Sequence, residues 1–206
     1  PKLVETSFEL EVTPQAETLL TSKIDNDLNY RGESISVSGS LNGPLGGLSN
    51  QTVWLIIDSK IEDGDVTDET GLYSLNYDLY SNEELGNFNI SIIYNETDWF
   101  LGSSVNNSFN VRGTTTFENV KVEGDWFNKE IRRGGVINVY GILVDDLGNR
   151  INDTISVSIG NVDLETIFTN ETTFVSTGII PDDYRNNRTV KIGYNGSYYL
   201  DGNQSK

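Results

Sequence analysis

The stretch Arg31-Gly-Glu-Ser-Ile-Ser-Val-Ser-Gly-Ser-Leu41 decides the fold of this chain, because a second version follows as Arg133-Gly-Gly-Val-Ile-Asn-Val-Tyr-Gly-Ile-Leu143. Both versions begin with Arg-Gly and agree again at four alternate positions: Ile35 with Ile137, Val37 with Val139, Gly39 with Gly141, and Leu41 with Leu143. Alternate residues point to one face of a β-strand. The stretch therefore predicts a strand with one buried face, present twice.

The repeat extends well beyond this strand. At the same offset of 102 residues, the segment 50–57 lies over 152–159, and at an offset of 100 the segment 90–95 lies over 190–195. Such a period predicts two similar units of about 100 residues, the commonest size of an independent domain. We expect one domain over residues 13–112 and a second over 113–206, with residues 1–12 forming a strand of a preceding or neighbouring unit.

Short alternating runs separated by turn residues fill both units. Strands are predicted over residues 17–24, 33–42, 51–58, 71–79, 87–95, 105–112, 115–124, 135–144, 153–160, 163–169, 172–178 and 188–195. No segment has a sustained 3.6-residue apolar period, and frequent short strands of this kind are typical of a sandwich. The predicted fold class is all-β, with two tandem immunoglobulin-like β-sandwich domains.

The composition excludes most catalytic chemistry. The chain has no cysteine and no histidine, which removes thiolate nucleophiles, histidine triads and most zinc sites. A formal charge of −17 opposes binding to nucleic acid, whose phosphates need positive partners. We therefore expect no enzyme activity, no cofactor and no nucleic-acid partner.

The chain starts at Pro1 and contains no methionine, so we expect a mature or excised piece of an exported protein. No run approaches the roughly 18 apolar residues that a membrane-spanning helix needs. The expected location is extracellular, at the cell surface, without direct insertion of this segment into a membrane.

Asn-X-Ser/Thr sequons are the most informative chemical motif. They start at Asn50, Asn89, Asn95, Asn106, Asn152, Asn170, Asn187, Asn195 and Asn203. Their number is about twice what the contents of Asn, Ser and Thr predict by chance, and Asn50 and Asn95 have repeat counterparts in Asn152 and Asn195. Sequons in an exported chain mark exposed sites for covalent N-glycans. The alternative is that a chain rich in Asn and Thr produces sequons that stay unused.

The sequence predicts an extra strand at the start of the chain and a missing strand at its end. The segment Thr6-Ser-Phe-Glu-Leu-Glu-Val12 alternates Phe8, Leu10 and Val12, and resembles Asn107-Ser-Phe-Asn-Val111 at the end of the first unit. The second unit has no such segment and is expected to lack its own last strand. A missing strand opens a sheet edge to pairing, so the segment is predicted to contact copies of the chain by donor-strand exchange, or adjacent repeats.

Acidic clusters are weaker candidates for function. Asp63, Asp65, Asp68 and Glu69 supply oxygen ligands that would suit Ca²⁺, although turn-forming acids between two strands explain them as well. The pairs Asp145-Asp146 and Asp182-Asp183 suggest the two carboxylates of a glycosidase, but neighbouring acids in a strand point apart. We expect no metal site beyond this possible calcium site, and no catalytic residue.

The repeated Arg-Gly-x-x-Ile/Val-x-Val-x-Gly-x-Leu motif, Gly148-Asn149-x-x-Asn152-x-Thr154, and the turn at residues 67–74 resemble the tandem Ig-like repeats of archaeal and bacterial cell-surface proteins. The resemblance implies an architectural role, as in S-layer, pilus-like and adhesin proteins. The expected function is a structural glycoprotein of a filament, surface layer or stalk. An adhesin module, or an accessory module of a larger exported enzyme, remains an alternative.

Overall fold

The computed structural model describes residues 14–127, 130–169, 173–184, 187–197 and 199–205 of the chain. Its regular elements are all β-strands, and the described residues contain no helix long and apolar enough to cross a membrane. The strands build two compact units. The first contains the described residues up to Asp27, with Ser34–Leu79 and Asn87–Phe109, and the second contains Leu28–Glu33, Tyr80–Gly86 and the described residues from Asn110 onward.

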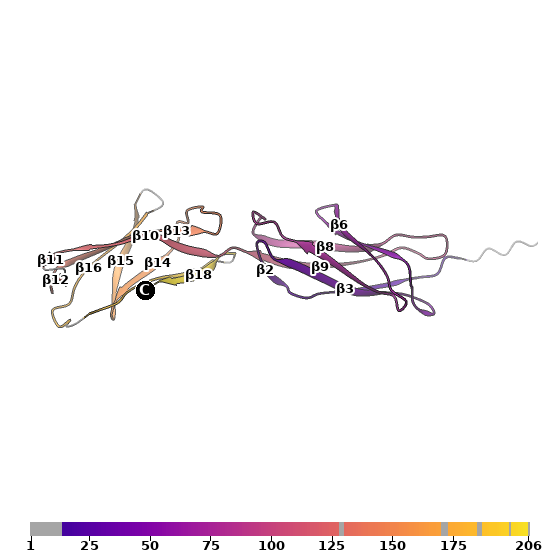
Figure 1. The fold of residues 1–206 in the computed structure, drawn as a ribbon, viewed down its shortest axis with the longest axis horizontal. Coiled ribbons are helices and arrows are strands. Elements are labelled where there is room, and N and C mark those ends of the chain that lie inside the picture. Colours follow the sequence, from indigo (N-terminus) through magenta and orange to yellow (C-terminus); the bar gives the residue numbers. More distant parts are fainter. Residues whose placement is uncertain (1–13, 128–129, 170–172, 185–186, 198, 206) are drawn as a thin grey trace, which may run out of the picture. The chain divides into compact units, whose positions relative to one another are not determined.

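The first unit is a sandwich of two sheets (Figure 1). Its strands are β1 (Leu19–Ile24), β3 (Ser34–Gly43), β4 (Gly46–Gly47), β5 (Thr52–Ile57), β6 (Lys60–Val66), β7 (Leu72–Asp78), β8 (Gly86–Tyr94) and most of β9 (Ser103–Arg112). In one sheet β3 pairs with β1, β4 and β7; in the other the order is β9, β8, β5, β6. The short β2 (Leu28–Tyr30) runs parallel to the end of β9, Asn110–Arg112.

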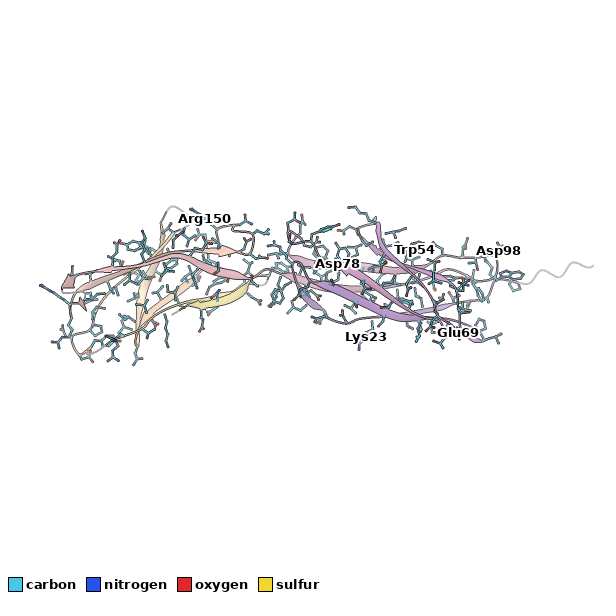
Figure 2. The ribbon with its side chains drawn as sticks, viewed as in Figure 1. Lys23, Trp54, Glu69, Asp78, Asp98 and Arg150 are labelled. Carbon is cyan, nitrogen blue, oxygen red and sulfur yellow. The ribbon has the colours of Figure 1, made fainter. Side chains whose placement is uncertain are left out.

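The core of the first unit follows the predicted alternation. Ile35, Val37 and Leu41 of β3 are at most 1% exposed, and the next strands contribute Val53, Leu55, Ile57, Ile90 and Ile92. Trp54, labelled in Figure 2, points to the opposite face of β5, where its ring lies against Gly64. The buried face predicted from the repeated stretch is confirmed, because alternate apolar side chains leave water together.

The second unit repeats this plan with one change. Its strands are β10 (Thr115–Gly124), β11 (Trp126–Phe127), β12 (Glu130–Ile131), β13 (Val136–Asp145), β14 (Ile155–Ile159), β15 (Val162–Thr169), β16 (Thr173–Ile179), β17 (Val190–Gly196) and β18 (Asp201–Ser205). Strand β15 pairs with β14 through Val162–Leu164 and then with β16 through Glu165–Thr169. Seven strands therefore form one continuous path from β10 to β18 around a single apolar core. The fold class predicted from the sequence, two tandem Ig-like sandwiches, is confirmed.

The glycine shared by the two copies of the repeated stretch makes room for an aromatic ring. A Cβ atom at Gly39 would lie 1.9 Å from the carbonyl oxygen of Thr21 and 2.5 Å from the hydroxyl oxygen of Tyr73. At Gly141 it would lie 2.6 Å from the ring of Phe174. Close packing of this kind leaves no space for even one methyl group. The glycine is thus required at the same place in both units.

All twelve predicted strands form, with ends within two residues of the prediction. The described residues contain six further strands that were not predicted: the short β2, β4, β11 and β12, and the longer β6 and β18, which each require a correction. Strand β6 was predicted as an acidic turn, but it pairs with β5 despite its exposed, polar sequence. The prediction that the second unit lacks its last strand is also corrected. The chain turns at Gly196, whose φ of 86° favours glycine, and β18 then pairs antiparallel with β17.

Candidate functional site

Two sequons of the first unit lie at the same end of its second sheet. Asn50 precedes β5 and Asn95 follows β8, and these two strands pair with Val53 opposite Tyr94. Both asparagines are exposed. The buried Tyr94, which directly precedes Asn95, donates a hydrogen bond of 2.9 Å from its hydroxyl group to Oε1 of Gln51, the middle residue of the Asn50 sequon. The hydroxyl group of a buried tyrosine therefore links the Asn95 sequon to the Asn50 sequon by one hydrogen bond.

The second unit has the same arrangement. Asn152 and Asn195 are exposed, and Ile155 of β14 lies opposite Tyr194 of β17. The hydroxyl group of Tyr194 donates to Oδ2 of Asp153, the middle residue of the Asn152 sequon, at 3.0 Å. Burial, together with the hydrogen bond to this carboxylate and its charge, raises the pKa of the Tyr194 hydroxyl, although Ser197 opposes the effect. The tyrosine keeps its proton and remains a donor near neutral pH.

These tyrosines were not singled out as site residues from the sequence. Tyr94 and Tyr194 match in the repeat, but the alternation of a strand predicts such a match without any role for the hydroxyl groups. Their hydroxyl partners lie 43 and 41 residues away. Only the pairing of the two strands brings these partners within reach.

Two more sequons share the outer face of β8 and β9. Asn89 and Asn106 are exposed, whereas Ile90 and Phe109 of the same two strands point into the core at 1% exposure each. The hydroxyl group of Ser91 donates to Oδ1 of Asn106 at 2.7 Å. Nδ2 of Asn106, the atom to which an N-glycan would be attached, makes no hydrogen bond to any residue that the structure describes. This face of the first unit can therefore carry two glycans.

The remaining sequons differ from one another. Asn187 is exposed ahead of β17, while Asn170 lies outside the described residues. Asn203 is half-buried in β18, and its Nδ2 donates a short hydrogen bond to the carbonyl oxygen of Thr115 on β10. A sugar on this Nδ2 would have to fit beside β10, against the carbonyl oxygen to which the amide already donates. Asn203 is therefore a structural asparagine, unlike the exposed ones.

The predicted contact strand, with Phe8, Leu10 and Val12, lies outside the described residues. Its counterpart in the sequence, at the end of β9, is well defined. Phe109 and Val111 are 1% and 0% exposed, and the ring of Phe109 stacks on Phe88 with centroids 5.4 Å apart. A segment with the same alternation has the side chains to fill such a position.

Two of the calcium candidates join the edges of the two sheets of the first unit. Oδ2 of Asp63 accepts a hydrogen bond of 2.7 Å from the backbone nitrogen of Asn76, and Oδ2 of Asp65 accepts one of 2.7 Å from that of Ser74. Both donors lie on the outer edge of β7. The counterpart strand in the second unit, β15, pairs with β16 through its own backbone instead. In the first unit, the carboxylates of β6 thus accept hydrogen bonds from the edge of β7, where the second unit has backbone hydrogen bonds between β15 and β16.

Asp68, another of the calcium candidates, also has partners within the protein. Oδ1 of Asp68 accepts from the backbone nitrogens of Leu72 and Thr70 and from the Thr70 hydroxyl group, and these bonds lower the pKa of Asp68. Glu69 is exposed in the same turn (Figure 2). Across the described ranges, no three acidic side chains are grouped closely enough to hold a metal ion.

The two proposed carboxylate pairs are placed differently from each other. Burial alone would raise the pKa of Asp145, but hydrogen bonds from Asn149 and Leu147 and the nearby Arg31 outweigh it and lower the pKa. Asp182 and Asp183 are exposed. The Asp145 carboxylate therefore stabilises the turn over residues 145–149 by accepting hydrogen bonds from Leu147 and Asn149.

Removing both bridging carboxylates is expected to destabilise the first unit. In the double variant Asp63→Ala/Asp65→Ala, two backbone N–H groups lose charge-assisted hydrogen bonds, each worth about 1 to 1.5 kcal/mol in this half-exposed setting. Urea unfolding should show a loss of about 2 to 3 kcal/mol. The control, Asp63→Asn/Asp65→Asn, keeps an oxygen acceptor and should lose less than half of that. Equal losses in the two variants would contradict a hydrogen-bonding role.

Comparisons with known proteins found similarity only among solved structures. No protein-family model matches the chain, and no curated protein matches it. Among solved structures, the titin fragment A168–A169 is similar with a TM-score of 0.45 and 9% identity, covering 92% of this chain and 95% of that one. A C-terminal 282-residue fragment of intimin, in complex with the intimin-binding domain of the translocated intimin receptor, is similar with a TM-score of 0.47 and 13% identity. This similarity covers 91% of this chain and 62% of the intimin fragment. The D0–D1 domains of intimin are similar with a TM-score of 0.37 and 13% identity, over 91% of this chain and 98% of that one. These likenesses concern the fold, tandem Ig-like domains.

Proposed function

We propose that this chain is a non-enzymatic, N-glycosylated protein of the cell surface, a subunit or segment of a filament, surface layer or stalk. The observation that carries the proposal is the pair of exposed sequons tied by a buried tyrosine in each unit. Sequons that arise by chance have no reason to share a supporting hydrogen bond at matching places. The partners are covalent N-glycans and copies of the chain or adjacent Ig-like repeats.

Such glycans would have a physical role. Glycans on Asn89 and Asn106 would cover the outer face of β8 and β9, and those at Asn50 and Asn95 one end of the same sheet. Bulky hydrated groups there hinder proteases and prevent sheet edges from pairing with other chains. A surface protein exposed to other cells and enzymes benefits from both effects.

Peptide mapping of the native protein by mass spectrometry tests this proposal. Peptides with Asn50, Asn95, Asn152 and Asn195 should carry additional mass in sugar-sized steps, whereas the peptide with Asn203 should have its unmodified mass. The internal control is Asn203→Gln, which should leave the intact mass of the glycoprotein otherwise unchanged. Unmodified peptides at all four paired sequons would refute the proposal.

Assembly by strand exchange is the finer part of the proposal. The second unit already has its last strand, β18, so residues 6–12 would add to a sheet edge of another copy rather than fill a gap. Their likeness to the end of β9, where Phe109 and Val111 are buried, supports such an addition. The variant Phe8→Ser/Leu10→Ser should shift the chain from oligomer to monomer in light scattering coupled to gel filtration. Glu9→Gln, on the opposite face of the segment, should leave the oligomer intact. A chain that is monomeric without any substitution would contradict strand exchange while leaving glycosylation untouched.

A further inference from the structure

A hollow of about 370 Å³ lies on the outer face of the second unit. It is formed over β10, β13 and β16, and β10 and β13 pair directly. Its lining includes Asn119, Lys121, Glu123, Tyr140, Ile142 and Thr173. None of these residues belongs to a sequon. Thr173 directly follows the Asn170 sequon in the sequence, so the hollow borders this sequon without including its residues.

An irregularity in β10 produces this hollow. Glu118 lies opposite Ile142 and Lys121 lies opposite Tyr140, so that two residues, Asn119 and Val120, face the single residue between Tyr140 and Ile142. Asn119 takes the left-handed conformation, with a φ of 53°, which asparagine tolerates better than most residues. Such bulges bend a strand and redirect the side chains beside it.

The strands of the first unit that correspond to β10 and β13, β1 and β3, lack this bulge. Strands β1 and β3 pair without a register shift, from Leu19 opposite Asn42 to Ile24 opposite Val37. The residue opposite Lys23 is Ser38, where the second unit has Tyr140 opposite Lys121. A bulge that served only to protect an edge strand would not require an aromatic ring at this outward position.

The side chains in the hollow suit a sugar. Tyr140 is half-buried and presents an amphipathic ring next to the apolar Ile142, and aromatic rings of this kind pack against apolar faces while remaining near water. Asn119, Lys121 and Glu123 are exposed and offer an amide, an ammonium and a carboxylate group. A few polar groups around an apolar platform are typical of a small-molecule site.

We propose that this hollow binds one uncharged pyranose residue of a glycan. Its volume is at the low end of the range of about 300 to 1,000 Å³ for ligand sites, which suits one ring better than a long oligosaccharide. The net charge of −17 and the carboxylate of Glu123 disfavour acidic sugars. The ring of Tyr140 packs against the C–H face of the pyranose, and Asn119 and Glu123 hydrogen-bond its hydroxyl groups.

Titration of the ¹⁵N-labelled 206-residue chain with glucose, galactose, mannose or N-acetylglucosamine tests this inference by NMR. At least one of these sugars should shift the backbone amide signals of residues 119–123 and 140–142 saturably, with a dissociation constant in the millimolar range. The variant Tyr140→Ser introduces the residue found at the same place in the first unit and should weaken binding at least tenfold. Asn119→Gly, which fits a φ of 53° without strain, should weaken it about fivefold.

Tyr80→Ser provides the matched control, because Tyr80 is 63% exposed and lies outside the hollow. This variant should bind as the unchanged chain does. The inference is overturned if no sugar gives saturable shifts, if Tyr140→Ser binds as well as the unchanged chain, or if only a charged sugar such as glucuronate binds. Saturable binding abolished by Tyr140→Ser would also favour the adhesin alternative for the whole protein.

Discussion

Replacing Gly39 with alanine is expected to lower the free energy of unfolding of the first unit by about 3 kcal/mol. The new methyl group would lie 1.9 Å from the carbonyl oxygen of Thr21, an impossible distance, so that β1 must move away from β3. This movement would also break the hydrogen bond of 2.5 Å that the Tyr73 hydroxyl group donates to the same carbonyl oxygen. Burial raises the pKa of Tyr73 to about 12, so its hydroxyl group is a donor at neutral pH.

Hydrogen exchange measured peptide by peptide separates this effect from any change in the second unit. Exchange in β1, β3 and β7 should accelerate in Gly39→Ala, while β13 and β16 keep their protection. Ser38→Ala is the control, because the exposed Ser38 side chain points to the other face of β3. A Gly39→Ala protein as stable as Ser38→Ala would show that the shared glycine is not required for packing.

Truncation of Phe174 to alanine is expected to cost the second unit about 3 to 5 kcal/mol. The Phe174 ring is fully buried, contacts Phe117 edge-on with centroids 6.0 Å apart, and fills the space beside Gly141. Its removal leaves a cavity that the surrounding strands cannot close. Urea unfolding followed by circular dichroism should report the loss.

The exposed Ile179 of the same strand serves as control for Phe174. At 63% exposure, Ile179→Ala should change the free energy of unfolding by no more than about 0.5 kcal/mol. A double-mutant cycle adds a sharper test: Gly141→Ala combined with Phe174→Leu should cost less than the sum of the two single changes, because the smaller side chain leaves room for the methyl group. Additive losses would contradict direct packing between these residues.

The sequence predicted the strands whose side chains alternate between core and solvent. The copies of the repeated stretch became β3 and β13, with the buried residues on the predicted face. It did not predict β6, since Lys60–Val66 has no apolar face and is paired only because β5 lies beside it. It also misplaced the end of the second unit, where β18 depends on a turn at Gly196 rather than on an apolar pattern.

The candidate sites show the same division. Sequence alone identified every sequon, but it did not distinguish Asn203 from Asn195. The amide nitrogen of Asn203 donates a hydrogen bond to the carbonyl oxygen of Thr115, whereas Asn195 is exposed. It grouped Asp63 and Asp65 as possible calcium ligands, while the fold uses their carboxylates to join two sheet edges. In each case the partner is a backbone group on a strand distant in the sequence.

By itself, the sequence determined that this protein is a twofold repeat of an all-β unit, because the alternation of apolar side chains is local and records which face leaves water. The tertiary structure decided which polar groups face one another: the tyrosines that tie sequons in pairs, the carboxylates between sheets, and the hollow beside Tyr140. Polar side chains carry no period that marks their partners, and hydrogen bonds depend on atoms brought within about 3 Å by the packing of separate strands.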